Sequence, residues 1–428
     1  MESSPTTPED ILRDYYAYES SLPLTPKPSS PNYLNTAAFG SPYPTSLTLN
    51  TRLLELCYEQ PMIYHRELVP KLMERSKKSV CSYLKISDVG KFRFVNSVST
   101  AIFRILESGN WKPGDVVVTS DCIYHSIKDT LLSLSHTHKI KWLQIKTPPN
   151  PTSTIIFSNF ERVLGETKNV KLVLIDSISS KPSLLFPIPQ ISRLCTSLKI
   201  PTLIDAAHLP GSLLSSKIDV ESLGVTFFVC TFHKWCGTLR SAGGMYVDVE
   251  VLNVVAPGFW DLKRIIDTPS LKNPNLYLDA GEPGFLTDYL TKGLYDESTR
   301  GYENFIILDH CLKRVLEDES KFEYDVRGFR EEVFRIWKEA FGREDFFGRE
   351  ENLPIISLLL PTSRLKLKFP TSDLKEIKKI LTPKLWNEYG IEVPTFVWGD
   401  ELCVRISYWG EKTIEGVRKL VEVLNLIC

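Results

Sequence analysis

Residues 227–247 read FFVCTFHKWCGTLRSAGGMYV and place a lysine between a histidine and a tryptophan. An apolar run precedes Lys234 and a glycine-rich run follows it, so the surroundings predict burial. Most lysines stay in water, because desolvating an ammonium group is costly. A desolvated lysine has a lowered pKa and is a competent nucleophile, which predicts a chemical role for Lys234.

Four further apolar runs of the same kind precede this one. The five runs are residues 92–97, 115–120, 170–177, 200–208 and 226–233. Their apolar character is continuous rather than alternating, which is typical of parallel strands covered on both faces. Helix-length segments separate several of them, so we predict an α/β fold with a mostly parallel sheet between two layers of helices.

The composition excludes several classes of protein. A net charge of −1 and a pI near 6.7 argue against nucleic acid as the main partner. We expect no membrane partner and no signal peptide, because no apolar run approaches about 20 residues and the start is acidic and polar. Nine cysteines without a CxxC pair predict neither a disulfide framework nor a zinc site, and they favour the cytoplasm. His136 and His138 lack a third ligand, so we expect no metal.

Polar side chains stand where these predicted strands end. They are Ser99, Thr100, Tyr124, Asp176, Asp205, His208, Thr231, His233 and Lys234. Helix capping, turns or core packing would explain each of them alone. Ligands of parallel α/β sheets bind at the carboxyl ends of the strands, so together these side chains predict one site.

A planar, phosphorylated pyridine-type aldehyde would use the whole set. Its phosphate needs a helix N-terminus and hydroxyl groups, which Ser99, Thr100 and Thr231 would supply. Its ring needs a stacking partner, for which Tyr124 is the candidate.

The reactive atoms of the same ligand account for the charged residues. The ring nitrogen must stay protonated to act as an electron sink, which requires a buried carboxylate such as Asp205. The aldehyde needs an amine, and Lys234 would form a Schiff base with it.

The motifs LIDAAHLPG (203–211) and TFHKW (231–235), together with a late RIS (405–407), make the chain similar to a known group. It resembles the pyridoxal-phosphate (PLP) enzymes of fold type I, in the class V aminotransferase superfamily. The resemblance runs from about Tyr33 to the C-terminus. It implies PLP as cofactor and a mostly parallel central sheet flanked by helices, with a smaller C-terminal α+β domain.

This resemblance implies three regions. Residues 1–32 would be an N-terminal arm, because 21–31 are rich in proline and serine. Residues 33–305 would be the large PLP-binding α/β domain, and 306–428 the small C-terminal domain. Within residues 301–342 we predict two amphipathic helices, and from 401 onward a strand, a turn and a helix.

Four residues resemble the family's catalytic groups. Asp205 matches the aspartate that pairs with the pyridinium nitrogen, and Lys234 matches the Schiff-base lysine. His208 resembles the residue near the cofactor's phenolic oxygen, and Tyr124 matches the stacking aromatic.

The remaining correspondences concern binding. The segment NSVSTA (96–101) resembles the phosphate loop. The predicted cofactor-binding residues, besides those four, are Ser99, Thr100, Thr231, His233 and Asp176. Arg405 resembles the arginine that binds the substrate's α-carboxylate through two hydrogen bonds. Asn35, Thr36 and Ala37 resemble the segment that borders the substrate.

The chain departs from the family at one place. A Gly-Thr pair, whose threonine reaches the phosphate in the partner subunit, is replaced here by Gly293 and Leu294. Ser298 or Thr299 would have to substitute, or one phosphate contact is missing. The resemblance otherwise implies a homodimer with shared active sites and an amino-acid substrate.

Several reactions share this chemistry. The layout of the motifs is most similar to isopenicillin N epimerase-like proteins and to the hercynylcysteine sulfoxide lyases of ergothioneine biosynthesis. This resemblance favours a carbon–sulfur lyase that acts by β-elimination on a cysteine-derived sulfoxide. An amino-acid epimerase or a cysteine desulfhydrase comes next. A desulfurase needs a cysteine on a mobile loop before Arg405, but Cys403 lies inside the predicted strand. A noncatalytic binding relative is the remaining alternative.

Overall fold

The computed structural model describes residues 7–22, 32–148, 151–261, 301–342, 346–347 and 352–427. Its centre is a seven-stranded sheet with the order β1-β7-β6-β5-β4-β2-β3. The strands are β1 (Phe92–Val95), β2 (Val116–Ser120), β3 (Lys141–Ile145), β4 (Val170–Asp176), β5 (Thr202–Ala206), β6 (Phe227–Thr231) and β7 (Gly243–Val247). β7 is antiparallel to both of its neighbours, β1 and β6, and the other four pairings in this sheet are parallel. The prediction of a mostly parallel sheet is therefore confirmed.

Two strands of this sheet were not among the five predicted runs. β3 lies at the edge and alternates between exposed and half-buried residues up to the buried Ile145, so it lacks a continuous apolar run. β7 begins with Gly243 and Gly244, which are poor strand formers. Both glycines are needed for packing, because a Cβ on Gly243 would crowd the carbonyl oxygens of Cys230 and Val95 on the adjacent strands.

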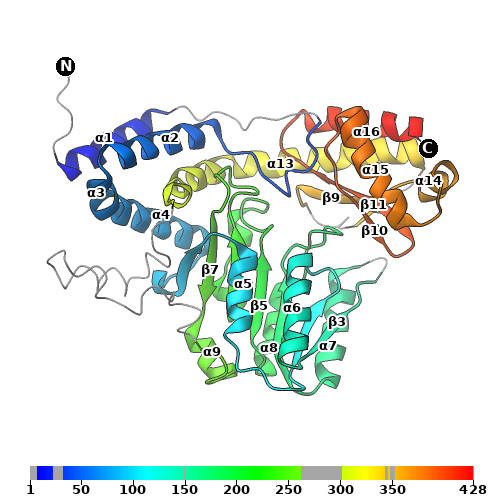
Figure 1. Cartoon of the computed structure of the whole chain (residues 1–428), viewed down its shortest axis with the longest axis horizontal. Coiled ribbons are helices and arrows are strands. Elements are labelled where there is room, and N and C mark those ends of the chain that lie inside the picture. Colours follow the sequence, from blue (N-terminus) through cyan, green and yellow to red (C-terminus); the bar gives the residue numbers. More distant parts are fainter. Residues whose placement is uncertain are drawn as a thin grey trace.

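Helices cover both faces of the sheet (Figure 1). They include α5 (Val98–Glu107), α6 (His125–Thr137), α7 (Ser153–Glu166), α8 (Ile188–Ser197) and α9 (Val249–Val255). Successive residues of β4 enter different cores: Val173 packs in one cluster and Leu174 in another. The continuous apolar run of this strand therefore reflects burial on both faces.

The N-terminal region is more ordered than the sequence suggested. Its helices are α1 (Pro8–Ser21), α2 (Pro44–Glu59), α3 (Pro61–Ile63), a π-helix (Tyr64–Leu68) and α4 (Val69–Leu84). From the sequence we expected an arm over residues 1–32, with compact structure beginning near Tyr33. This expectation is wrong for α1, which buries Ile11, Leu12 and Tyr15 in the main core. Thr7 caps this helix by accepting from the amide of Asp10. The domain boundaries after residues 32 and 305 stay predictions.

The C-terminal region has its own antiparallel sheet, in the order β10-β11-β9-β8. Its strands are β8 (Phe346–Phe347), β9 (Ile355–Leu359), β10 (Thr395–Trp398) and β11 (Glu401–Ser407), with helices α14 (Thr362–Lys368), α15 (Leu374–Tyr389) and α16 (Thr413–Ile427). The strand, turn and helix predicted from residue 401 onward are thus confirmed.

One long helix joins the two sheets. Within residues 301–342 the structure has the short α12 (Glu303–Ile306) and the 34-residue α13 (Leu308–Phe341), so the prediction of two amphipathic helices is wrong. Gly328 does not interrupt α13, because a single glycine in a helix costs only about 1 kcal/mol. α13 crosses the molecule above the large sheet (Figure 1) and packs Leu308 in the main core and Val333 in the C-terminal core. Among the described residues, no helix combines the length and apolar character that crossing a bilayer requires.

Candidate active site

The carboxyl ends of the central strands bring the predicted polar residues together. Asp176 ends β4, Asp205 lies one residue before the end of β5, and Thr231 ends β6. Asp176 and Asp205 are paired residues of adjacent parallel strands, and both side chains are buried. Lys234 follows β6 by three residues, in the tight segment that connects it to β7.

The backbone around Lys234 is fixed by close packing. A Cβ on Gly40 would overlap the carbonyl oxygens of His233 and Lys234, so only glycine allows this approach. Gly211 has a φ of +77°, and a Cβ there would crowd Trp235 and Cys236. Neither glycine was recognised from the sequence as part of the site.

The amine of Lys234 lies among groups that set its charge. Its Nζ is 3.2 Å from Nε2 of His208. Burial lowers the pKa of Lys234 to about 8, the charge of Asp205 opposes this shift, and the nearby Arg405 guanidinium adds to it. The sequence prediction of a lysine poised as a nucleophile therefore has a physical basis in the structure.

The imidazole of His208, next to Lys234, is neutral. Burial lowers its pKa well below the ordinary value, and the charge of Lys234 lowers it further. A neutral imidazole has one donor and one acceptor nitrogen, so Nε2 accepts from Lys234 and Nδ1 carries the hydrogen. Nδ1 has no hydrogen-bond partner among the described residues and is free to donate to a ligand.

The two carboxyl groups resist ionisation. Burial raises the pKa of Asp205, and a hydrogen bond from the amide of Ala207 to Oδ1, 3.0 Å long, opposes this shift. Burial also raises the pKa of Asp176 well above its usual value, and the neighbouring charge of Asp205 adds to the effect. Oδ2 of Asp176 has no hydrogen-bond partner among the described residues.

Two helix N-termini lie side by side at this edge. α5 begins after Ser97, whose hydroxyl caps the helix by accepting from the amide of Thr100. Ser99 in its first turn is 3.0 Å, oxygen to oxygen, from Ser126 in the first turn of α6. Paired hydroxyls and free backbone amides at helix N-termini suit a phosphate. Ser126 was not among the predicted site residues.

Thr231 supports His233 rather than facing open space. Its hydroxyl donates to the carbonyl oxygen of Ala242 at 3.0 Å and accepts from Nδ1 of His233 at 2.6 Å. The hydroxyl hydrogen is thereby used, so Thr231 fixes the imidazole. Burial lowers the pKa of His233 to about 4, so the ring is neutral at neutral pH. Direct contact of either residue with a phosphate stays a prediction.

Arg405 is a buried cation whose hydrogen-bond partners are all neutral. Nη1 donates to Oγ of Ser180 at 2.7 Å, and Nη2 donates to Oδ1 of Asn35 at 2.6 Å. No carboxylate in the described part of the chain forms an ion pair with this guanidinium, and burial lowers its pKa to about 10. Such a group favours an incoming carboxylate. Ser180 was not predicted from the sequence.

The predicted substrate-bordering segment divides into two parts. Asn35 reaches the site through its contact with Arg405. Thr36 and Ala37 are fully buried, and the amide of Ala37 donates to Oγ of Ser407 at 3.2 Å. The Ala37 amide thus fixes the segment to the end of β11.

Tyr124 lies at the N-terminus of α6, and its side chain is 39% exposed. Burial raises its pKa, the Asp205 carboxylate adds to the shift, and Arg405 opposes it. Tyr124 is therefore close to both charged groups, as a ring-stacking residue should be. Its stacking role stays a prediction.

Comparison with known proteins agrees with this geometry. The Aminotransferase class-V family model matches residues 62–245, which include Asp205 and Lys234. Residues 62–245 of the chain belong to the class V aminotransferase family.

Relatives of this class V chain include several enzymes of sulfur metabolism. It is 27% identical to an L-cysteine desulfhydrase-like protein of Epichloe uncinata over 219 residues, 50% of this chain and 47% of the relative. It is 26% identical to an L-cysteine desulfhydrase of Arabidopsis thaliana over 216 residues, 47% of each chain. It is 21% identical to the hercynylcysteine sulfoxide lyase of Schizosaccharomyces pombe over 227 residues, 53% of this chain and 57% of the relative. The matches thus span about half the length of these relatives.

Solved structures show the fold of the class V chain. A cystine C–S lyase in complex with cysteine persulfide matches with a TM-score of 0.68 and 15% identity, over 92% of this chain and 97% of the other. A cysteine desulfurase from Thermococcus onnurineus matches with a TM-score of 0.65 and 16% identity, over 99% of each chain. The predicted fold type I architecture is confirmed.

The residues of this class V site fit PLP, the predicted cofactor. The site offers an amine with a lowered pKa, a buried carboxylate and a helix N-terminus with hydroxyls. Two buried polar atoms, Nδ1 of His208 and Oδ2 of Asp176, lack hydrogen-bond partners among the described residues. Buried polar groups are normally paired, so these atoms indicate a bound polar ligand.

One predicted departure cannot be placed. Gly293, Leu294, Ser298 and Thr299 lie outside the described residues. The predicted homodimer with shared sites therefore stays a prediction.

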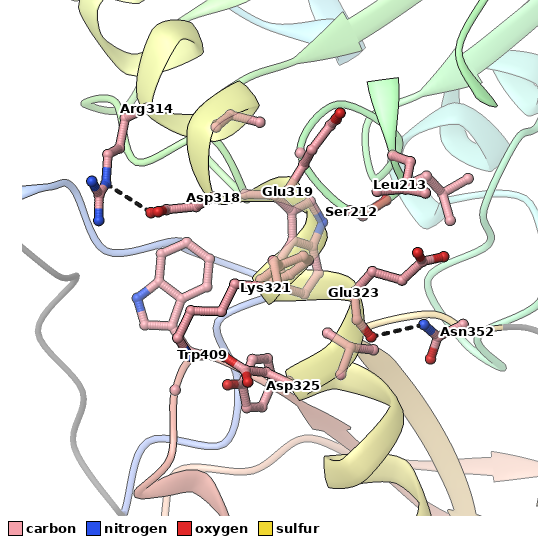
Figure 2. A pocket seen from close by; sticks show the side chains of 18 of the residues that line it. Ser212, Leu213, Arg314, Asp318, Glu319, Lys321, Glu323, Asp325, Asn352 and Trp409 are labelled. Atoms are coloured by element: carbon pink, nitrogen blue, oxygen red, sulfur yellow. Dashed lines mark hydrogen bonds and ion pairs between the residues drawn. The ribbon is translucent and has the colours of Figure 1, made fainter. Parts of the chain in front are cut away.

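A separate cavity of about 430 Å³ lies on the other side of the Lys234 segment, between α13 and residues 408–412. Figure 2 shows Trp409 at this cavity, together with the Arg314–Asp318 ion pair of 2.7 Å. Trp235 contributes to its wall, but none of the predicted site residues does. We therefore place the chemistry at the strand ends and not in this cavity.

Proposed function

We propose that this chain is a PLP-dependent carbon–sulfur lyase acting on a cysteine-type amino acid by β-elimination. The observation that carries this proposal is a single cluster: the Lys234 amine 3.2 Å from His208, with Asp205 and the Arg405 cation nearby. Among the described residues, Arg405 has no ion-pair partner. An amine, a buried acid and a carboxylate receptor are the groups that this chemistry needs.

Each of these residues has a defined task. Arg405 binds the substrate's α-carboxylate, and Asn35 and Ser180 orient its guanidinium. PLP, when bound, supplies a protonated ring that withdraws electrons from Cα, and Asp205 keeps the ring nitrogen protonated. His208 accepts a hydrogen bond from Lys234 and so holds the amine in place. The neutral amine of Lys234 then removes the Cα proton.

The bond changes balance without an added oxidant or reductant. The Cα proton goes to the amine, and the Cβ–S bond breaks with its electron pair on sulfur. Sulfur leaves as hydrosulfide from a free thiol, as a thiolate from a thioether, and as a sulfenate from a sulfoxide. The resulting 2-aminoacrylate becomes an imine, which water hydrolyses to pyruvate and ammonia.

The cysteines argue against the desulfurase alternative. A persulfide carrier must be exposed and deprotonated. Cys403 is buried within β11, and every other described cysteine except Cys57 is buried too. Burial also raises the pKa of Cys57.

Two substrates of this class have support. Similarity to hercynylcysteine sulfoxide lyase, together with the motif layout, supports a cysteine-derived sulfoxide such as hercynylcysteine sulfoxide of ergothioneine biosynthesis. The names of the other relatives support L-cysteine. We also propose a cytoplasmic homodimer, in line with the sequence.

The deciding experiment measures pyruvate from the PLP-loaded protein. L-cysteine, an S-alkylcysteine sulfoxide and hercynylcysteine sulfoxide are each supplied in deuterated water. We expect pyruvate and ammonia in equal amounts from at least one of them. Exchange of the Cα hydrogen without pyruvate would favour an epimerase. Neither exchange nor pyruvate, with tight amino-acid binding, would favour a noncatalytic relative.

The lowered pKa of Lys234 predicts how PLP capture depends on pH. Only the neutral amine attacks the aldehyde, so the capture rate at fixed PLP should rise about tenfold per pH unit and level off near pH 8. The absorbance change after mixing cofactor-free protein with PLP measures this rate. A free lysine peptide, which should level off near its ordinary pKa of 10.5, is the control. A midpoint for the protein near that of the peptide would contradict the assigned environment.

A further inference from the structure

The site contains two carboxyl groups where the proposed chemistry uses one. Asp176 and Asp205 are paired residues of the parallel strands β4 and β5, so their side chains point to the same face. Adjacent strands lie about 4.8 Å apart, which brings the two carboxyl groups next to each other. Each residue is only 4% exposed. Two buried carboxylates this close cannot both ionise cheaply.

The surrounding charges do not balance two anions. Lys234 is the basic group that follows β6, and Lys128 approaches from α6. Lys128 already donates to the backbone oxygen of Asp121 at 2.9 Å. His208 is neutral and hydrogen-bonded to Lys234, while Arg405 lies on the substrate side with Asn35. Tyr124, Cys122 and Cys230 also lie near the pair, and none of them adds positive charge.

The hydrogen bonds distinguish the two acids. Oδ1 of Asp205 accepts from the amide of Ala207, and a backbone N–H favours the charged form of a carboxylate. Oδ2 of Asp176 has no partner of this kind among the described residues, although it is buried. A proton on Asp176 would give this oxygen a hydrogen to donate and would remove the repulsion.

We propose that Asp176 keeps its proton at neutral pH and acts as a neutral positioning residue, so that the pair carries one negative charge, on Asp205. The part of this inference that concerns Asp205 as the partner of the ring nitrogen rests on the proposed function. A second anion next to Asp205 would leave an unpaired buried charge once PLP is bound. The protonated acid avoids this cost.

The first test uses infrared spectroscopy of the cofactor-free protein at pH 7. The wild type should show the carbonyl band of one buried protonated carboxylic acid. Asp176→Asn should abolish this band, because the remaining acid can then ionise. Asp129→Asn, at an exposed position of α6, is the matched control and should leave the band intact. Absence of the band in the wild type, or its survival in Asp176→Asn, would overturn the proposal.

Stability gives an independent check. The folded protein holds a proton that the unfolded chain releases above about pH 4, so stability should fall as pH rises. The unfolding equilibrium constant of the wild type should rise up to tenfold per pH unit relative to Asp176→Asn. If the stability of the wild type and that of Asp176→Asn depend on pH in the same way, Asp176 does not hold a proton in the folded protein.

The final arm assigns the proton within the pair. The absorption of bound PLP is titrated with pH in Asp176→Asn and in Asp205→Asn. Asparagine imitates a neutral acid, so the first variant should keep the wild-type midpoint within about 0.5 pH unit. The second should shift it by more than 1 unit. The reverse pattern would place the proton on Asp205 and overturn the assignment. None of these readouts requires turnover, so a failed lyase assay would refute only the proposed reaction.

Discussion

Replacing Lys234 with alanine should lower pyruvate production by at least about 1000-fold. The variant loses both the amine that binds PLP covalently and the base that removes the Cα proton. General base catalysis alone contributes about 100- to 10,000-fold. Pyruvate release at saturating substrate measures the loss of activity. Borohydride reduction followed by mass spectrometry measures the covalent bond, which should be present in the wild type and absent from the variant.

A matched lysine separates this effect from a general loss of charge. Lys168 is exposed and lies just before the start of β4, at the opposite end of this strand from the site. Lys168→Ala should therefore retain both the activity and the covalent adduct. Free PLP should still bind to Lys234→Ala, because Asp205 and the N-terminus of α5 remain. If reduction adds the same mass to Lys234→Ala as to the wild type, another residue is the covalent partner.

The sequence predicted the part of the fold that depends on local patterns. Continuous apolar runs identified five strands, because burial on both faces removes polar residues from them. β3 was missed because Lys141 and Gln144 interrupt its apolar character at the sheet edge. β7 was missed because its glycines serve close packing between strands and not strand propensity. α1 was missed because the proline-rich segment after it concealed a capped helix that only tertiary contacts stabilise.

The candidate site could be predicted where topology alone brings residues together. Asp176 and Asp205 lie at the carboxyl ends of adjacent parallel strands and Lys234 follows the next strand, and the structure places them at one edge. Ser180 and Gly40 could not be predicted, because they come from loops whose paths depend on packing against distant segments. The proximity of Arg405 to the site came from the resemblance, since Arg405 belongs to a second sheet and no spacing in the sequence places it there.

Truncation of Arg405 is expected to have the second large effect. Arg405→Ala leaves the substrate's α-carboxylate in a buried position without its cation. Losing one partner of a buried charge pair costs about 2–5 kcal/mol, so kcat/KM should fall by about 30-fold or more. The carboxylate is bound both before and during the reaction, so most of the loss should appear as a higher KM. Steady-state kinetics on the substrate identified by pyruvate release measure this division.

Two further variants show whether charge or shape matters at this position. Arg405→Lys keeps the charge but cannot donate to Ser180, Asn35 and a carboxylate in one plane, so it should recover only part of the affinity. Arg418→Ala, at an exposed ion pair with Glu332 on the surface of α16, should change kcat/KM by less than about twofold.

A substrate analogue isolates the carboxylate itself. Wild-type protein should bind L-cysteine at least about 30-fold more tightly than cysteamine, which lacks the carboxylate. Arg405→Ala should lose this discrimination, because the group that distinguishes the two molecules is gone. Equal discrimination in the wild type and the variant would mean that the carboxylate binds elsewhere. A buried arginine held only by neutral oxygens would then need another negatively charged partner.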